Sequence, residues 1–247
     1  MISPLLSAVC GTGFIFAMSV LGAALVFFFA VQPQVHIQSV FTGFASGVMF
    51  AASVWSLLIP SMELGSVLPF PCWLPAAVGI VSGALFLCLL DGYIRRLSRF
   101  ENAGNAMLVT AITLHNIPEG MAVGLAFALA GDSEGLAAAS ALALGIGIQN
   151  LPEGAAVALP LRNAGASRFK AFGIGAASGA VEPVFGLLAV LAAAIASPLM
   201  PWLLGFAAGA MLYVCVSELI PSSCNVSGIS GFMLGFILMM VLDVSLG

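Results

Sequence analysis

The sequence predicts an all-α protein that crosses a membrane several times, and three observations predict this class. Hydrophobic residues make up 62% of the 247 residues and charged residues only 6%, whereas a soluble domain carries about 25% charged residues. The mean hydropathy is +1.18. Hydrophobic runs of about 20 residues, the length that spans a bilayer as a helix, follow one another along the chain. We therefore expect a single transmembrane domain over residues 1–247.

Eight membrane-spanning helices are predicted from hydrophobic runs bounded by proline, glycine and charged residues. The first run follows a segment without basic residues, Met1–Pro4, so we expect it to be retained as a span and not cleaved as a signal peptide. Small residues crowd positions 173–179, and such residues let membrane helices approach closely. In chain order, the expected spans are 5–31, 39–60, 72–91, 103–130, 135–160, 170–196, 202–221 and 228–246.

The basic residues predict the orientation of these spans. All six lie in two predicted loops: Arg95, Arg96 and Arg99 between spans three and four, and Arg162, Arg168 and Lys170 between spans five and six. With eight spans the two loops share one side of the membrane, which the positive-inside rule assigns to the cytoplasm. Both termini are then expected outside the cytoplasm. Short loops without a targeting segment favour a bacterial inner (plasma) membrane, and the few basic residues argue against nucleic acid as a partner.

Two near-copies of one motif lie inside the fourth and fifth spans: His-Asn-Ile-Pro-Glu-Gly at 115–120 and Gln-Asn-Leu-Pro-Glu-Gly at 149–154. A rise of 1.5 Å per residue places His115 roughly 18 Å and Gln149 roughly 21 Å into their spans, near the membrane midplane. An ionisable group at that depth costs roughly 2.5 kcal/mol or more and usually marks an ion pathway. The two spans run in opposite directions, so we expect an inverted repeat around a central site, built on helices broken or kinked by proline.

The chemistry of these side chains favours a divalent metal ion. His115 and Glu119 share one helix face because they are four residues apart, and Gln149 and Glu153 repeat the spacing. Imidazole and carboxylate ligands suit Zn²⁺ and other first-row divalent ions. Together with Glu182, the glutamates need a metal or protons to neutralise them. The prolines of the motifs either free backbone carbonyl groups to line a cavity or simply kink packed helices.

Other polar residues extend this hypothesis. Asn116, Asn150 and Glu182, which precedes a proline, are candidates for an adjacent second site bridged by the glutamates of the motifs; alternatively, the asparagines form hydrogen bonds between helices. Acidic residues at the predicted span ends either attract cations at the two mouths of a pathway or are merely solvated helix-end charges. They are Glu63 and Asp243 on the outer side and Asp91 and Glu218 on the inner side. The five cysteines show no paired spacing and are expected to pack as free thiols.

The two motifs, the Glu182-Pro183 pair and the seventh span, with residues 209–213 and 218–221, together resemble the ZIP (Zrt/Irt-like) metal transporters, and Gln149 resembles their GufA-type branch. The resemblance covers essentially the whole chain. It implies one metal bound by His115, Glu119, Gln149 and Glu153 with Met49 nearby, and a second bound by Asn116, Asn150 and Glu182 with the motif glutamates bridging. Some relatives carry aspartate at the position of Asn150, and many have a histidine-rich loop after span three that is absent here. The family also implies elevator-type transport and a homodimer.

We therefore expect a transporter of Zn²⁺, and of Fe²⁺, Mn²⁺ or Cd²⁺, into the cytosol, with no organic cofactor and no enzymatic activity. Two alternatives come from other classes. An intramembrane metalloprotease would need two histidines one turn apart with a glutamate between them, and a serine protease of the rhomboid type would need a glycine before the serine of Ser46-Gly47 or Ser178-Gly179. A carrier of anions or organic solutes would need cationic or hydrogen-bonding groups at the midplane, where the sequence places carboxylates.

Overall fold

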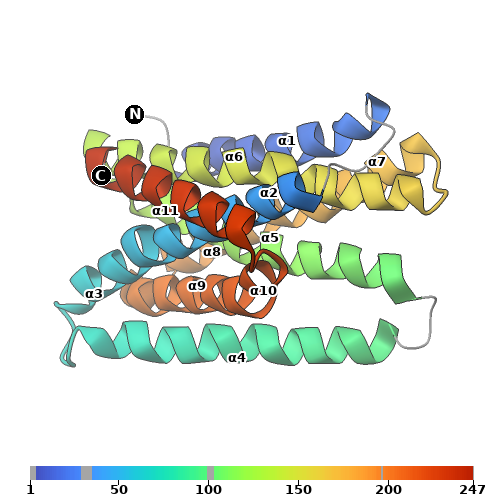
Figure 1. Cartoon of the computed structure of the whole chain (residues 1–247). Coiled ribbons are helices and arrows are strands. Elements are labelled where there is room, and N and C mark those ends of the chain that lie inside the picture. The colour runs from blue at the N-terminus through green and yellow to red at the C-terminus, as the bar shows by residue number, and fades with distance from the viewer. Residues whose placement is uncertain (1–3, 29–34, 99–102, 196, 247) are drawn as a thin grey trace.

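The computed structural model describes residues 4–28, 35–98, 103–195 and 197–246, which are almost entirely helical (Figure 1). The elements are α1 (Pro4–Ala24), η1 (Leu25–Phe27), α2 (Val35–Ala52), η2 (Ser53–Leu58), α3 (Ile59–Gly65), α4 (Trp73–Ser98), α5 (Ala103–Leu129), α6 (Ser133–Asn163), α7 (Arg168–Gly179), α8 (Val181–Ile195), η3 (Ser197–Leu199), α9 (Met200–Val214), η4 (Cys215–Leu219), α10 (Ile220–Ser222) and α11 (Val226–Leu246). No strand occurs in these ranges, so the predicted all-α class is confirmed.

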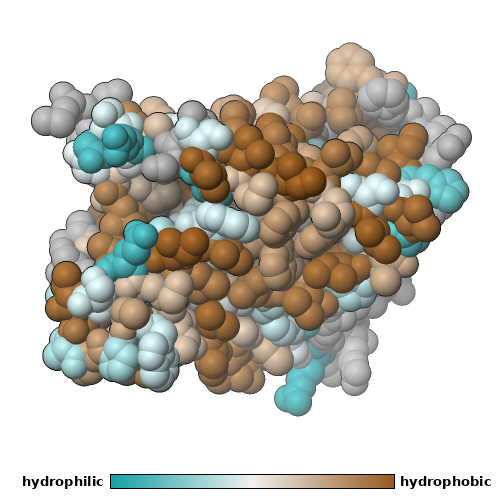
Figure 2. Space-filling model, turned by 60° about the vertical axis from the view of Figure 1, so that its left-hand side comes forward, coloured by the Kyte–Doolittle hydropathy of each residue, from teal (hydrophilic) through white to brown (hydrophobic). Residues whose placement is uncertain are grey.

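Seven helical stretches are long and apolar enough to cross a membrane. They are Leu5–Phe27, Ser39–Gly65, Trp73–Tyr93, Ser133–Asn163, Arg168–Ala193, Met200–Ser222 and Val226–Ser245. The remaining predicted span, the fourth, at 103–130, corresponds to α5, whose described apolar stretch, Asn116–Leu129, is shorter. Figure 2 shows hydrophobic side chains over the middle of one face and hydrophilic ones towards its margins. The chain is therefore a polytopic integral membrane protein.

The helices alternate in direction, as Figure 1 shows. α4 ends and α5 begins at the same end of the bundle at which α6 ends and α7 begins, so the two predicted basic loops share one end. The start of α1 and the end of α11 lie at the opposite end. The bundle thus has the relative topology that eight crossings require.

Proline affects these helices in different ways. α5 and α6 continue through Pro118 and Pro152 as single helices, so neither is interrupted at its motif. One lost backbone hydrogen bond can bend a helix without ending it when neighbouring helices pack around it. The sixth span, by contrast, is divided: α7 ends at Gly179 and α8 begins at Val181, with Glu182 in its first turn.

The second and seventh spans contain π-helical turns that the sequence analysis did not predict. η2 and η4 are both π-helical, and each ends two residues before a proline, Pro60 or Pro221. The surrounding sequences are near-copies, Ser-Leu-Leu-Ile-Pro-Ser at 56–61 and Ser-Glu-Leu-Ile-Pro-Ser at 217–222. Single π-helical turns inside α-helices often occur at functional sites.

Two helix pairs repeat the same close packing. A Cβ atom added to Gly47 of α2 would lie 2.1 Å from the Phe232 oxygen of α11, and one added to Gly209 of α9 would lie 2.2 Å from the Ile80 oxygen of α4. Only glycine permits backbones to approach so closely. Because α2 and α9 run in opposite directions (Figure 1), the pairs α2–α11 and α9–α4 form an inverted repeat.

The helices that carry the motifs lie where two groups of helices meet. α6 packs along α1 and α5 along α8 in one group, while α2 packs along α11 and α4 along α9 in the other. α5 also contacts α9, and α6 also contacts α2 and α11. Four described polar residues of the motifs, Asn116, Glu119, Gln149 and Asn150, accordingly lie buried inside the bundle.

Candidate metal site

The motif side chains are withdrawn from the surface of the bundle. Glu119, Gln149, Asn150 and Glu182 are each 0% exposed. Glu153 is half-buried as a residue, but both of its carboxyl oxygens are buried. The backbone of His115 lies in α5; its side chain is outside the part of the chain that the structure describes. The structure therefore gathers carboxyl and amide groups from three helices, α5, α6 and α8, in the interior.

Glu119 and Gln149 connect the two motif helices directly. Gln149 Nε2, on α6, donates a hydrogen bond to Glu119 Oε1, on α5. The remaining oxygens of this pair, Glu119 Oε2 and Gln149 Oε1, are buried and accept no hydrogen bond from the described residues. One carboxyl and one amide oxygen are thus left free on adjoining helices.

Glu182 is held from a different direction. Ser19 Oγ, on α1, donates to Glu182 Oε1 at 2.8 Å, while Glu182 Oε2 is buried without a partner among the described residues. The amide of Asn150 lies beside this carboxyl group and donates to the Ile15 carbonyl oxygen at 3.4 Å, which leaves Asn150 Oδ1 unpartnered. Glu182 thus presents one committed oxygen and one free oxygen.

Glu153 has no hydrogen bond at either carboxyl oxygen within the described ranges. It lies within electrostatic range of both Glu119 and Glu182, which are also in range of each other. An ionised carboxylate can only accept hydrogen bonds, and like charges in a low-dielectric interior repel strongly. This arrangement is stable only when protons or a cation balance the charge.

Together, Glu119, Gln149, Asn150, Glu153 and Glu182 contribute six buried oxygen atoms that lack a hydrogen-bond partner in the described structure. Most buried polar atoms in folded proteins are paired, so this concentration indicates a site for an electropositive ligand. The His, Cys, Asp and Glu side chains that the structure describes form no group of three close enough to enclose a metal ion by themselves. A metal would accordingly be shared between carboxyl and amide oxygens.

Asn116 forms a hydrogen bond between helices, which was the alternative considered for it. Its Nδ2 donates to the Ser178 carbonyl oxygen of α7 at 2.9 Å, which is a hydrogen bond between helices. The same bond places the asparagine next to the break between α7 and α8, close in sequence to Glu182. Asn116 therefore has a packing role whether or not its oxygen binds a cation.

The glycine that ends each motif allows a third helix to approach. A Cβ atom on Gly120 would lie 2.2 Å from the Glu182 backbone oxygen, and one on Gly154 would lie 2.1 Å from the Ser19 backbone oxygen. The motifs therefore supply ionisable groups and also the close helix contacts that bring Glu182 and Ser19 to them.

Two sulfur-containing residues lie deep in the bundle. Met49, predicted from the family resemblance, is fully buried in α2 and belongs to the larger hydrophobic core. Cys215, at the start of η4, is also fully buried; its thiol lies within electrostatic range of Glu119 and Glu153 and 3.7 Å from the Ser46 carbonyl oxygen. No sequence pattern around Cys215 or Ser19 marked either residue as part of the site. The repeat around Pro60 and Pro221 was the one sequence signal that pointed to the turn containing Cys215.

The acids predicted for the pathway mouths have different surroundings. Asp243 is largely buried and accepts a hydrogen bond from Ser56 of η2 at 2.6 Å, while its Oδ2 is unpartnered among the described residues. Glu63 is exposed in α3. Asp91 and Glu218 are half-buried and engaged in further interactions, and α4 continues past Asp91 to Ser98.

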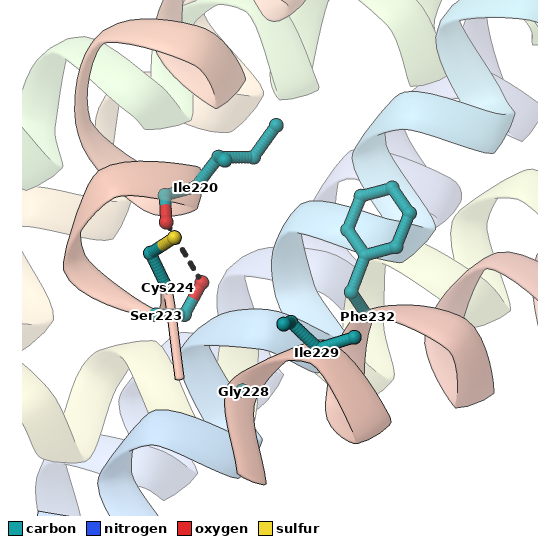
Figure 3. A pocket seen from close by; sticks show the side chains of 6 residues that line it. All are labelled: Ile220, Ser223, Cys224, Gly228, Ile229 and Phe232. Atoms are coloured by element: carbon teal, nitrogen blue, oxygen red, sulfur yellow. Dashed lines mark hydrogen bonds between the residues drawn. The ribbon is translucent and has the colours of Figure 1, made fainter. Parts of the chain in front are cut away.

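A separate pocket of about 200 Å³ lies between the end of α10 and α11, and Figure 3 shows its lining. The lining is Ile220, Ser223, Cys224, Gly228, Ile229 and Phe232. It is almost wholly apolar, and its one hydroxyl group, on Ser223, donates within its own turn. No motif residue reaches it, so it is distinct from the carboxylate cluster.

Buried carboxyl and amide oxygens on antiparallel helices of a membrane protein are typical of the class of ion transporters. Comparison with known proteins agrees. A family model described as "ZIP Zinc transporter" matches residues 96–243. The chain is 36% identical to zinc transporter ZIP11 of Xenopus tropicalis over 99% of this chain and 98% of that protein.

Two bacterial proteins are also similar to the chain. Zinc transporter GufA of Myxococcus xanthus is 44% identical over 78% of this chain and 81% of its own length. Zinc transporter ZIPB of Bordetella bronchiseptica is 35% identical over 85% and 72%, respectively. The chain therefore belongs to the ZIP zinc transporter family, with a GufA-like relative, and it is a transporter and not an enzyme.

Proposed function

We propose that this protein carries divalent metal cations, Zn²⁺ foremost, across the membrane into the cytosol through the buried cluster on α5, α6 and α8. The observation that carries the proposal is the set of six buried oxygens without hydrogen-bond partners in the described structure. Membership of a family of zinc transporters supports Zn²⁺ as the substrate. Fe²⁺, Mn²⁺ and Cd²⁺ share these ligand types and are further candidate substrates.

The proposed ligands fall into two neighbouring sets. Glu119, Gln149 and Glu153 bind the first metal together with His115, and Met49 lies at its edge. The Gln149–Glu119 hydrogen bond supports this set because it brings α5 and α6 into contact at the motifs. Asn116, Asn150 and Glu182 bind a second metal, with the motif glutamates shared between the two. The nearness of Asn150 and Glu153 to Glu182 supports the second set.

The acids at the span ends provide the proposed route to and from this site. Asp243 and Glu63 would attract cations on the outer side, and Asp91 and Glu218 on the inner side. The basic residues that the sequence placed in two loops lie, where the structure describes them, at the ends of α4 and α6 and the start of α7. These helix ends lie at one end of the bundle, which we assign to the cytoplasm of a bacterial inner membrane, with both termini outside. We further propose that the protein functions as a homodimer.

Zinc uptake by the purified protein in lipid vesicles tests the proposal. Vesicles loaded with a zinc-sensitive fluorescent dye should fill rapidly with the wild-type protein and not with Glu153→Ala. The substitution removes the carboxylate whose two oxygens have no hydrogen-bond partner among the described residues, so it should eliminate most uptake even at saturating zinc. Equilibrium binding of Zn²⁺ to the purified protein should be weakened by the same substitution.

The matched control is Glu134→Ala, which removes an exposed acid from the first turn of α6. It changes the net charge by the same amount as Glu153→Ala but leaves the buried cluster intact, so uptake should remain at the wild-type rate. Full uptake by Glu153→Ala at saturating zinc would overturn the proposal.

A further inference from the structure

Ser19 makes a side-chain contact between α1 and the candidate metal site. Its side chain is 4% exposed, and its hydroxyl donates to Glu182 Oε1 at 2.8 Å, much shorter than its 3.4 Å contact with the Ile15 carbonyl oxygen of its own helix. A buried serine in a membrane helix commonly donates to the carbonyl four residues earlier. Ser19 instead makes its shorter hydrogen bond with a carboxyl group of another helix.

Two glycines from different helices make room for Ser19. A Cβ atom on Gly154 of α6 would lie 2.1 Å from the Ser19 backbone oxygen. One on Gly179, at the end of α7, would lie 2.8 Å from Ser19 Cβ and 3.3 Å from Glu182 Oε1. Any larger side chain at either glycine would push Ser19 away from Glu182. The packing of three helices around α1 therefore preserves this one hydrogen bond.

The hydrogen bond changes how Glu182 can bind a cation. Because Oε1 already accepts the Ser19 hydroxyl, Oε2, which is buried and unpartnered among the described residues, is the oxygen more available to act as a ligand. Carboxylates bind metals through one oxygen or through both, and a hydrogen bond that holds Oε1 towards Ser19 favours the first mode. Zn²⁺ is satisfied by about four ligands, whereas Mn²⁺ favours a larger, oxygen-rich octahedral shell. A carboxylate limited to one oxygen therefore favours the smaller coordination number.

We propose that Ser19 is a positioning residue that favours one-oxygen coordination by Glu182 and so biases the site towards Zn²⁺ over Mn²⁺. This inference rests on the proposed function, because it assumes that Glu182 faces a transported cation. Ser19 itself need not touch the metal. Its effect passes through the orientation of the Glu182 carboxyl group.

Competition between the two metals in vesicle uptake tests this inference. Ser19→Ala removes the hydroxyl and frees Glu182 Oε1 while leaving packing space almost unchanged. The Zn²⁺ concentration at half-maximal uptake should rise by about tenfold, which is typical when a residue that orients a metal ligand is lost. The corresponding concentration for Mn²⁺ should stay the same or fall, so the Mn²⁺:Zn²⁺ preference shifts towards Mn²⁺. The maximal rate should change little.

Two further variants separate positioning from packing. Ser19→Thr keeps the hydroxyl and should keep the wild-type metal preference, even if its extra methyl group lowers the thermal unfolding temperature. Ser46→Ala removes another buried serine hydroxyl, on α2, whose hydrogen bond in the described structure goes to Gly43 of its own helix, and it should leave the preference unchanged.

The outcomes are distinct. An unchanged Mn²⁺:Zn²⁺ preference in Ser19→Ala overturns the role of Ser19, as does a shift that Ser19→Thr shows equally. Neither result affects the proposed function, provided that wild-type uptake depends on Glu153. Uptake that does not depend on Glu153 overturns both.

Discussion

The two copies of the motif have similar sequences but different surroundings. In the first copy, Glu119 on α5 receives a hydrogen bond from Gln149, and Asn116 donates to Ser178 at 2.9 Å. In the second copy, on α6, both oxygens of Glu153 lack partners in the described structure, and the Asn150 contact is longer, at 3.4 Å. The glutamate and asparagine of the first copy are thus held by the protein itself, and those of the second copy are held much less.

The same motif therefore provides one glutamate that a hydrogen bond fixes in place and one that lacks such a bond among the described residues. The hydrogen bond to Glu119 fixes its carboxyl group in position before any cation arrives. Glu153 has no such support, so its charge must be balanced by a cation or a proton. We infer that Glu119 forms the fixed part of the site and Glu153 the part that depends most on what is bound. Substitutions in the two copies should therefore have unequal effects.

The largest effect is expected from removing charge at the unsupported glutamate. Glu153→Gln should abolish zinc uptake. In metal-free protein it should raise stability by about 1–3 kcal/mol, because it removes a buried charge without partners. Zinc should stabilise the wild type strongly but the variant only weakly. Thermal unfolding with and without zinc measures both effects; a variant destabilised without metal would contradict the comparison.

A somewhat smaller effect is expected from removing the hydrogen bond that holds Glu119. Gln149→Ala removes the donor that fixes Glu119 Oε1 and also a candidate ligand. Zinc affinity should fall by about 10- to 100-fold, the range typical for loss of a group that orients a metal ligand. Isothermal titration of the purified protein would measure it. An affinity equal to that of the wild type would show that Glu119 does not need support.

The next largest effect is expected from substituting the motif glycines, because a larger side chain there disturbs the packing between helices. Gly120→Ala or Gly154→Ala inserts a methyl group about where the α8 or α1 backbone already lies, and such overpacking costs about 1–3 kcal/mol. Gly173→Ala in α7 is the control because its Cβ atom would meet nothing within 4 Å. The thermal unfolding temperature of the control should equal or exceed that of the wild type. Both motif variants should unfold at a lower temperature than the wild type.

The smallest effect is expected from the asparagines. Asn116→Ala loses the 2.9 Å bond to Ser178 and should cost about 0.5–1.5 kcal/mol of stability. Asn150→Ala loses a longer contact of 3.4 Å and should cost less. Equal losses in denaturant unfolding would mean that the two copies are held alike after all.

The class of the protein and most of its spans followed from the sequence alone. These features are local or depend on the bilayer: about 20 apolar residues suffice to cross it, and helix geometry alone puts residues four apart on one face. That is why Glu119, Glu153 and Glu182 could be identified as buried acids before the helices were placed. It is also why seven of the eight predicted spans recur as long apolar stretches of the structure.

The packing of the helices determines which carboxyl oxygens of these acids accept a hydrogen bond and which do not. The donors to Glu119 and Glu182 come from Gln149 and Ser19, which are 30 and 163 residues away in the chain. Ser19 looks like any small residue of a membrane helix until α1 packs against α6 and α7. The π-helical turns and the burial of Cys215 likewise depend on contacts between distant helices. A sequence pattern reports the periodicity of a single helix, whereas hydrogen bonds between helices depend on how all the helices pack together.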